Sequence, residues 1–463
     1  MPGFRDECAV FGIWGDPEAG RMAYLGLYAQ QHRGQESSGI VTLHDEQHLH
    51  HKGIGLVGEV FDEDNLQRLQ GTAAIGHNRY STTGENLITN AQPLTAILKS
   101  GPVAVAHNGN IVNASLLREE LIGQGAIFQG TNDTEVVLHM LSRNSNRDFI
   151  QCLQDAASRI EGAYSFTFLT NDCLVAMRDP YGFRPLILGR RKLENGKEAV
   201  VIASETCALD LIGARYEREI EPGEIFWATN QGEFSKRVEK NVKKLSQCVF
   251  EHVYFSRPDS IVFGKSVYEA RKSMGHELAK ESPVAADLVI PVPDSGVPAA
   301  LGYSIESKIP FELGIIRNHY IGRTFIQPSQ SIRNFAVKIK LNPQTHILKG
   351  KSVVIIDDSL VRGTTSQKII RMIRQAGAKE VHFRLASPPS VGSCFYGVDT
   401  PKRSQLIASH KSIDEICKFI GADSLAYLSV EGLLRAVGED GRGFCTACFT
   451  GNYPTDLYGL DRE

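Results

Sequence analysis

The sequence lacks long apolar runs and a strong net charge. Its 463 residues carry a formal net charge of −3, and 22% of them are charged. That balance argues against a basic nucleic-acid-binding surface and against an acidic disordered tail. Apolar runs such as Ser352–Ile356 and Leu288–Val292 are far too short to span a bilayer. Internal repeats and low-complexity segments are also absent. We therefore expect neither a nucleic-acid partner nor a membrane association.

A secretory signal is missing as well, because Met1–Glu7 is charged and has no apolar stretch. A cytoplasmic location is therefore expected. The nine cysteines are an odd number, which in such a chain favours thiols that do chemistry or bind metal over disulfides. Four cysteines have apolar neighbours and are predicted to be buried and structural: Cys152, Cys173, Cys207 and Cys417.

The length allows two or three domains, and the pattern changes near residue 240. Short strands such as Ala104–His107, Ser165–Leu169 and Ala199–Ala203 precede that point and are punctuated by glycine, which predicts a layered α+β sandwich. The basic, polar stretch Phe234–Lys244 is typical of a connector.

A different architecture is predicted beyond the connector. The apolar strands Leu288–Val292 and Val353–Ile356 each end in a turn that contains aspartate. A helix with one apolar face, Ile369, Ile370, Ile373 and Ala376, ends at Gly377 and is followed by a strand at Val381–Leu385. Strand, loop, helix and strand at this spacing indicate a βαβ unit of a parallel α/β sheet.

The sharpest motif runs from Val353 to Thr365. Asp357 and Asp358 stand at the carboxyl end of the strand, and a turn then opens a helix at Gly363. Carboxylates suit ribose hydroxyls, and amides and hydroxyls at a helix N-terminus suit a phosphate. The alternative is a strand that ends in an ordinary Asp turn and a Thr cap, but the completeness of the motif favours the functional interpretation.

This run resembles the signature of type I phosphoribosyltransferases. The resemblance implies that a phosphoribosyl pyrophosphate is bound by Asp294, Ser295, Gly296, Asp357, Asp358, Ser359, Arg362, Gly363, Thr364, Thr365 and Ser366. It also implies one Mg²⁺ at Ser295, Asp357 and Asp358, and closure of the loop Arg323–Ser329 over the substrate. On composition alone, Arg323–Ser329 is nearly as well explained as a plain exposed loop.

Near the other end, Cys8 would mean little by itself. Three polar, glycine-containing clusters change its interpretation: Gln31–Gly39, Gly76–Gly84 and His107–Asn110. Arginine suits a carboxylate clamp, and an amide side chain beside a glycine N–H supplies the donors of an oxyanion hole. Together these clusters resemble the class II glutamine amidotransferase domain, an N-terminal-nucleophile fold with four αββα layers.

That resemblance implies specific roles. Cys8 becomes the N-terminal nucleophile after removal of Met1–Glu7, and its own α-amino group acts as the base. Asn108 and Gly109 form the oxyanion hole, whereas Arg79 and Asp133 bind glutamine. His32, His77 and His107 are then structural.

Both domains in this order, with the stretch Tyr254–Asp259, resemble the glutamine phosphoribosylpyrophosphate amidotransferase family. The family implies glutamine hydrolysis, ammonia transfer to phosphoribosyl pyrophosphate and the formation of 5-phosphoribosylamine, the step that opens purine biosynthesis. It also implies domains at 8–240 and 241–463, a homotetramer and feedback inhibition by purine nucleotides.

Four cysteines fall where cluster-bearing members place their ligands: Cys248, Cys394, Cys445 and Cys448. The resemblance implies one structural [4Fe–4S] cluster per subunit, although four cysteines serve a tetrahedral zinc equally well. Other class II amidotransferases pair the glutaminase with a sugar isomerase or an ATP-pyrophosphatase domain. The acidic phosphoribosyl loop, and the absence of a Ser-Gly-Gly-x-Asp-Ser run, count against both. A non-catalytic nucleotide-sensing regulator would not need Cys8, Arg79, Asn108 and Asp133 together.

Overall fold

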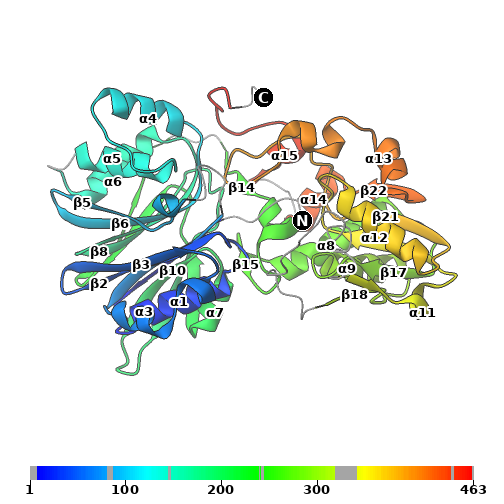
Figure 1. Ribbon diagram of the computed structural model, residues 1–463, viewed down its shortest axis with the longest axis horizontal. Coiled ribbons are helices and arrows are strands. Elements are labelled where there is room, and N and C mark those ends of the chain that lie inside the picture. Colours follow the sequence, from blue (N-terminus) through cyan, green and yellow to red (C-terminus); the bar gives the residue numbers. More distant parts are fainter. Residues whose placement is uncertain are drawn as a thin grey trace.

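The computed structural model describes residues 8–80, 87–143, 147–238, 240, 244–318, 341–438 and 443–460. Its first part (blue to green in Figure 1) lies beside a second part (green to red). Three predictions lie outside the described residues: the removal of Met1–Glu7, the Ser81–Gly84 end of one polar cluster and the loop Arg323–Ser329.

The first part contains two antiparallel sheets. One has seven strands in the order β11-β9-β10-β1-β4-β2-β3. Its strands are β1 (Ala9–Trp14), β2 (Ser37–His44), β3 (Gln47–Ile54), β4 (Ala73–Arg79), β9 (Ile187–Lys192), β10 (Glu198–Ala203) and β11 (Ala214–Glu219).

The other sheet has six strands in the order β13-β12-β8-β7-β6-β5. Its strands are β5 (Leu94–Leu98), β6 (Gly101–Ile111), β7 (Gly162–Thr170), β8 (Cys173–Arg178), β12 (Glu224–Thr229) and β13 (Gly232–Arg237). The prediction of a connector from Phe234 was wrong, because residues up to Arg237 form edge strand β13. All six of its residues are exposed, so the strand lacks the alternation of buried apolar and exposed polar residues by which a strand is predicted. Pairing with β12 and stacking of Phe234 on Trp227 hold it instead.

The two sheets face each other across a core that includes Val10, Ile75, Ala104 and Leu174. Helices cover both outer faces. On the seven-stranded sheet they are α1 (Ala19–Ala29), α2 (Val57–Val60), α3 (Glu63–Arg68) and α7 (Thr206–Leu211). On the six-stranded sheet they are α4 (Ala114–Gly123), α5 (Thr134–Arg143) and α6 (Phe149–Arg159), and a short turn η1 (Ile88–Asn90) precedes β5. The predicted αββα sandwich is confirmed.

The second part is built on a parallel sheet in the order β17-β20-β21-β22. Its strands are β17 (Leu288–Pro291), β20 (Ser352–Asp357), β21 (Glu380–Leu385) and β22 (Ser424–Tyr427). Val354 and Ile356 face the helices α8 (Val267–Glu281), α9 (Val297–Ser307) and α14 (Val430–Val437). Val353 and Ile355 face α11 (Thr345–Leu348), α12 (Thr364–Gln375) and α13 (Ile413–Ile420). The predicted parallel α/β sheet and the apolar face of α12 are confirmed.

Short elements join the two parts. The parallel pair β14 (Gln247–Cys248) and β23 (Phe444–Cys445) lies beside the π-helix η2 (Glu251–Phe255) and α15 (Ala447–Thr450). The remaining elements are β15 (Ile261–Val262), β16 (Lys265–Ser266), β18 (Ile315–Arg317), β19 (Leu341–Pro343), η3 (Arg403–Gln405) and η4 (Ile407–Ser409).

Candidate active sites

Cys8 lies immediately before β1, at the end of the seven-stranded sheet. The register of β1 and β4 pairs Ala9 with Asn78, so Arg79 ends its strand next to Cys8. Cys8 is buried, and its Sγ donates to the Tyr80 carbonyl at 3.4 Å. Arg79 is also buried. A thiol and a guanidinium suited to a carboxylate are thus brought together.

Asn108 and Gly109 lie on β6 in the facing sheet. A hydrogen bond of 2.9 Å between His77 Nε2 and the His107 carbonyl links the strand ends that carry Arg79 and Asn108. Within the described part of the chain, neither the Oδ1 nor the Nδ2 of buried Asn108 has a hydrogen-bond partner. Burying an amide without a hydrogen-bond partner costs free energy, so this side chain is suited to form hydrogen bonds with a bound substrate.

Gly109 has a φ of +147°, and a Cβ there would lie 2.1 Å from the Ala163 carbonyl oxygen. Only glycine fits that combination of backbone conformation and close approach. Gly109 therefore keeps its main chain next to the Asn108 amide, as an oxyanion hole requires.

Asp133 stands just before α5 with its carboxylate held on several sides. It accepts from the Ile111 N–H at 2.8 Å and lies 3.6 Å from His107 Nδ1. Burial favours the neutral acid, but His107 and these hydrogen bonds outweigh it and lower the pKa of Asp133. The carboxylate is therefore ionised at neutral pH, as a partner for an ammonium group must be.

The three histidines predicted to be structural each interact with other groups. His32 contacts Glu205 at 2.8 Å, and His107 Nδ1 lies 3.1 Å from Thr134 Oγ1. Burial lowers the pKa of His77 to about 3, so this ring is neutral at physiological pH.

A buried network of charges was not predicted. Arg33 Nε donates to the Cys8 carbonyl at 3.1 Å, and its Nη atoms pair with Glu205 at 2.6 Å and with Glu251 at 2.7 Å. Glu251 also pairs with Arg184 at 3.3 Å, and all four charged side chains are fully buried. Burial would raise the pKa of Glu205, but His32 and Arg33 outweigh it and lower that pKa to about 2. The network connects the Cys8 backbone to η2.

At the second site, Asp357 ends β20 and Asp358 follows it. Ser295 Oγ donates to Asp357 at 3.4 Å, and Ser359 Oγ donates to Asp358 at 2.6 Å. Burial first, and the neighbouring Asp358 second, raise the pKa of Asp357 well above its usual value. Two adjacent carboxylates of this kind attract a cation or hydroxyl donors.

The loops after β17 and β20 meet at this edge of the parallel sheet. A Cβ on Gly296 would lie 2.3 Å from the Ile356 carbonyl oxygen, so the loop after β17 touches the end of β20 through its backbone. Gly363, with a φ of +73°, is the N-cap of α12, and Thr364, Thr365 and Ser366 form the first turn of this helix. The N–H groups of such a turn suit a phosphate. Arg362 donates to Gln405.

Asp294 is exposed and forms an ion pair with Arg317 at 2.5 Å. Arg317 was not predicted as part of this site. It is separated from the motif in sequence, and only the fold of β18 brings it close.

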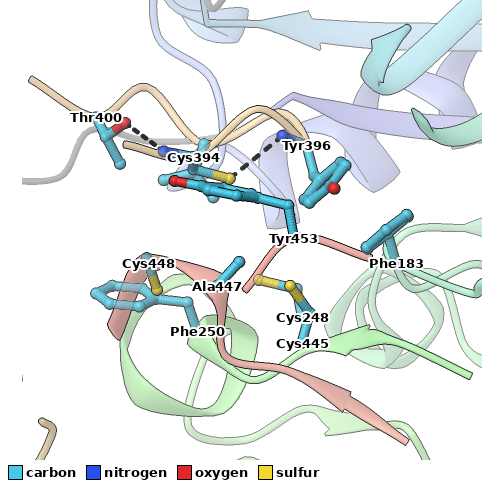
Figure 2. A pocket seen from close by; sticks show the side chains of 11 residues that line it. Phe183, Cys248, Phe250, Cys394, Tyr396, Thr400, Cys445, Ala447, Cys448 and Tyr453 are labelled. Carbon is cyan, nitrogen blue, oxygen red and sulfur yellow. Dashed lines mark hydrogen bonds between the residues drawn. The ribbon is translucent and has the colours of Figure 1, made fainter. Parts of the chain in front are cut away.

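The four cysteines proposed as cluster ligands line one cavity (Figure 2). The β14–β23 register places Cys248 directly beside Cys445. Cys394 and Cys448 complete the set, and Phe183, Phe250, Tyr396 and Tyr453 form much of the remaining wall. Burial raises the pKa of the Cys445 thiol to about 12.

The size of this cavity bears on what it can hold. Its volume of about 20 Å³ exceeds the roughly 10–15 Å³ that one water needs. Among the described residues, no three His, Cys, Asp or Glu side chains lie close enough to hold a single metal ion. The four thiols thus surround a space but do not converge on one point.

Of the other cysteines, Cys152, Cys173 and Cys207 are buried as predicted. The prediction was wrong for Cys417, which is only half-buried. Its helix α13 lies at the edge of the domain, and the thiol donates to the Ala422 carbonyl at 3.4 Å.

The fold and sites define a two-domain amidotransferase. The glutamine amidotransferase domain matches residues 77–211, and the phosphoribosyl transferase domain matches residues 270–386. The chain is 56% identical to amidophosphoribosyltransferase 1, chloroplastic, of Arabidopsis thaliana, over 97% of this chain and 79% of that protein. It is 48% identical to the Bacillus subtilis amidophosphoribosyltransferase, over 99% of this chain and 96% of that one.

A solved structure agrees in fold. The glutamine phosphoribosylpyrophosphate amidotransferase from B. subtilis, complexed with ADP and GMP, matches with a TM-score of 0.92 and 47% identity, over 98% of this chain and 99% of that one. The chain belongs to the amidophosphoribosyltransferase family, whose reaction is the first step of purine biosynthesis. None of the helices in the described ranges has the length and apolarity needed to cross a membrane.

Proposed function

We propose that this chain hydrolyses glutamine at Cys8 and transfers the ammonia to phosphoribosyl pyrophosphate at the Asp357–Asp358 loop. The products are 5-phosphoribosylamine, glutamate and pyrophosphate. The observation that carries the proposal is the placement of Cys8 beside Arg79, facing a strand whose buried Asn108 amide has no hydrogen-bond partner among the described residues. The same chain also has two adjacent aspartates at the end of β20 and, at the start of α12, a turn that is suited to a phosphate.

In the glutaminase half, the Cys8 thiolate attacks the side-chain amide carbon of glutamine. Removal of Met1–Glu7 gives Cys8 a free α-amino group, whose ordinary pKa near 8 lets it take the thiol proton at neutral pH. The same amine returns that proton to the leaving ammonia, and a glutamyl thioester remains until water hydrolyses it. The Asn108 amide and the Gly109 N–H stabilise the oxyanion.

Two charged groups hold the amino-acid end of glutamine. The Arg79 guanidinium binds the α-carboxylate in a bidentate manner. The Asp133 carboxylate, held ionised by His107, binds the α-ammonium group. Their charges are opposite to those of the amino acid, so the side-chain amide is directed toward Cys8.

In the ribosyl half, the lone pair of ammonia attacks C1 and the bond from C1 to the pyrophosphate oxygen breaks. Asp357 and Asp358 bind the ribose hydroxyls, and residues 359–366, including Arg362, bind the 5′-phosphate. Asp294, Ser295 and Gly296 receive the pyrophosphate. One Mg²⁺ held by Ser295, Asp357 and Asp358 would neutralise the charge of the leaving group. Ammonia must cross between the sites without meeting bulk water, which would protonate it.

We also propose one [4Fe–4S] cluster per subunit, held by Cys248, Cys394, Cys445 and Cys448. Four thiolates are the ligand set of such a cluster. The single cavity that all four cysteines line supports a shared site, and the family resemblance favours a cluster over a single zinc ion. Its role is structural, because it ties β23 and α15 to β14.

Regulation and assembly follow from the family. The ADP and GMP bound to the B. subtilis structure support feedback inhibition of this chain by purine nucleotides. A homotetramer, domains at 8–240 and 241–463 and a cytoplasmic location complete the proposal. Light scattering of the purified protein measures the first of these directly, and a mass below four subunits would contradict it.

The two halves are separated by an Asp358→Asn variant. It is expected to lose pyrophosphate release with ammonia as well as with glutamine, while glutamine hydrolysis continues. The exposed Asp414 on α13 supplies a control, Asp414→Asn, which should behave as wild type. Full ammonia-dependent release by Asp358→Asn would contradict the ribosyl assignment.

A further inference from the structure

A segment of the second part of the chain lies directly on the proposed oxyanion hole. Gly397, with a φ of +101°, approaches Gly109 so closely that a Cβ on Gly397 would lie 2.9 Å from both the Cα and the carbonyl carbon of Gly109. The same Cβ would lie 3.2 Å from the Gly109 oxygen. Backbone therefore rests on backbone, and no side chain can rotate away to make room.

Gly109 also lies close to Ala163 and to His107. A Cβ on Gly109 would meet the Ala163 oxygen at 2.1 Å and His107 Nε2 at 2.9 Å. Strand β7 and Gly397 thus both pack closely against Gly109. A Cβ added at Gly397 would therefore displace either Gly109 or the segment that carries Gly397.

The two residues that precede Gly397 are held to the first part by hydrogen bonds. Asn110 Nδ2 donates to the Phe395 carbonyl at 2.9 Å. Arg184 donates to the Tyr396 carbonyl through Nε at 2.9 Å and through Nη2 at 2.6 Å. The rings of Phe183 and Tyr396 stack at 4.1 Å. The position of Gly397 relative to Gly109 is therefore set over several residues.

We propose that Gly397 is a positioning residue for glutamine hydrolysis: it fixes the Cα and the carbonyl group of Gly109 and thereby the position of the residue whose N–H stabilises the oxyanion. Gly397 touches neither glutamine nor Cys8 in this proposal and acts through the backbone of Gly109. The inference rests on the proposed function, since it assumes that Asn108 and Gly109 form the oxyanion hole. It assigns to a residue outside the glutaminase domain a part in the rate of the glutaminase step.

The test compares Gly397→Ala with Gly451→Ala in the full-length holoenzyme. Gly451 also has a positive φ, +75°, and lies close to the cysteine cavity, but a Cβ there would meet no atom within 4 Å. The control therefore adds a Cβ at a positive φ without the contact. Pyrophosphate release is measured with glutamine and, separately, with ammonia, and iron and sulfide contents are measured in parallel.

Loss of one oxyanion donor costs about 10²–10³ in kcat, so a displaced one is expected to cost about tenfold or more. Gly397→Ala should lose at least about tenfold in glutamine-dependent kcat, while the KM for glutamine and the ammonia-dependent rate stay within about threefold of wild type. Gly451→Ala should match wild type in every measurement. A Gly397→Ala enzyme with unchanged glutamine-dependent kcat, or with an equal loss of the ammonia-dependent rate, overturns the inference.

If Gly397→Ala fails to fold or lacks iron, Asn110→Ala decides, since it removes the hydrogen bond to Phe395 without adding an atom. A severalfold fall in glutamine-dependent kcat, at unchanged ammonia-dependent rate, supports the inference, and an unchanged kcat overturns it. Wild type without glutamine-dependent release would overturn the proposed function itself. An active wild type beside an equally active Gly397→Ala would overturn this inference alone.

Discussion

Removing the Glu251 carboxylate is expected to destabilise the first domain, although Glu251 lies on η2 outside that domain's sheets. Its oxygens accept from Arg33 at 2.7 Å, from Arg184 at 3.3 Å and from Ser256 at 2.6 Å. Both arginines are fully buried and have no access to water. Glu251→Ala leaves them with one compensating carboxylate, Glu205, instead of two.

Breaking a buried ion pair by removing one partner costs about 3–5 kcal/mol, because the remaining charge is left uncompensated in a medium of low dielectric. For a domain of about 200 residues, each kcal/mol lowers the midpoint of thermal unfolding by about 2–4 °C. Glu251→Ala is therefore expected to lower that midpoint by about 6–20 °C.

The assay is thermal unfolding followed by tryptophan fluorescence. The chain has two tryptophans, and both Trp14 and Trp227 lie in the sheets of the first domain. Asp155→Ala is the matched control, since its pair with Arg147 at 2.6 Å is largely exposed, with side-chain exposures of 59% for the arginine and 31% for the aspartate. Such pairs contribute at most about 1 kcal/mol. A midpoint for Glu251→Ala no lower than that of the control would refute the reasoning.

Three further predictions follow from local contacts. The Cβ of Gly296→Ala would lie 2.3 Å from the Ile356 oxygen, so this variant should raise the KM for phosphoribosyl pyrophosphate about tenfold or more. The control Gly123→Ala, whose Cβ would meet nothing within 4 Å, should leave this KM unchanged. Equal KM values for the two variants would contradict the backbone contact. The pKa of Glu205 is lowered to about 2 in the folded state. The ionised Glu205 therefore stabilises the fold at pH values above the pKa of an unfolded glutamate, and this stabilisation is lost as the pH falls from that pKa toward the folded-state pKa. Wild type should thus lose about 2 kcal/mol more than Glu205→Gln between about pH 5 and about pH 3 in urea unfolding, and parallel curves would refute this. Cys445→Ser should lose the bound iron and sulfide, about four of each per chain, and Cys417→Ser should keep them; full iron in Cys445→Ser would exclude its ligand role.

Much of the fold follows from short-range patterns in the sequence. The apolar run Val353–Ile356 and the apolar face of α12 are local properties, and both elements form where predicted. Strand β13 could not be predicted, because all of its side chains are exposed and only its pairing with β12 makes it a strand.

The same distinction between local and long-range features applies to the site residues. Residues that belong to compact motifs, such as Asp357 and Asp358, were found because their neighbours in sequence are also their neighbours in space. The partners of Arg33 are separated from it by 172 and 218 residues, so its charge gave no hint of Glu205 or Glu251. The contact between Gly397 and Gly109 likewise joins two domains, and a lone glycine in a sequence carries no sign of it.

The central claim is that two separate sites share ammonia, and pyrophosphate release from phosphoribosyl pyrophosphate tests it most directly. Anaerobically purified wild type is compared with Cys8→Ala, with glutamine and with ammonia as the nitrogen source. We predict that wild type releases pyrophosphate with either source and that Cys8→Ala does so with ammonia only. Release with glutamine by Cys8→Ala would contradict the assignment of Cys8 as the nucleophile, and no release by wild type with either source would contradict the ribosyl site.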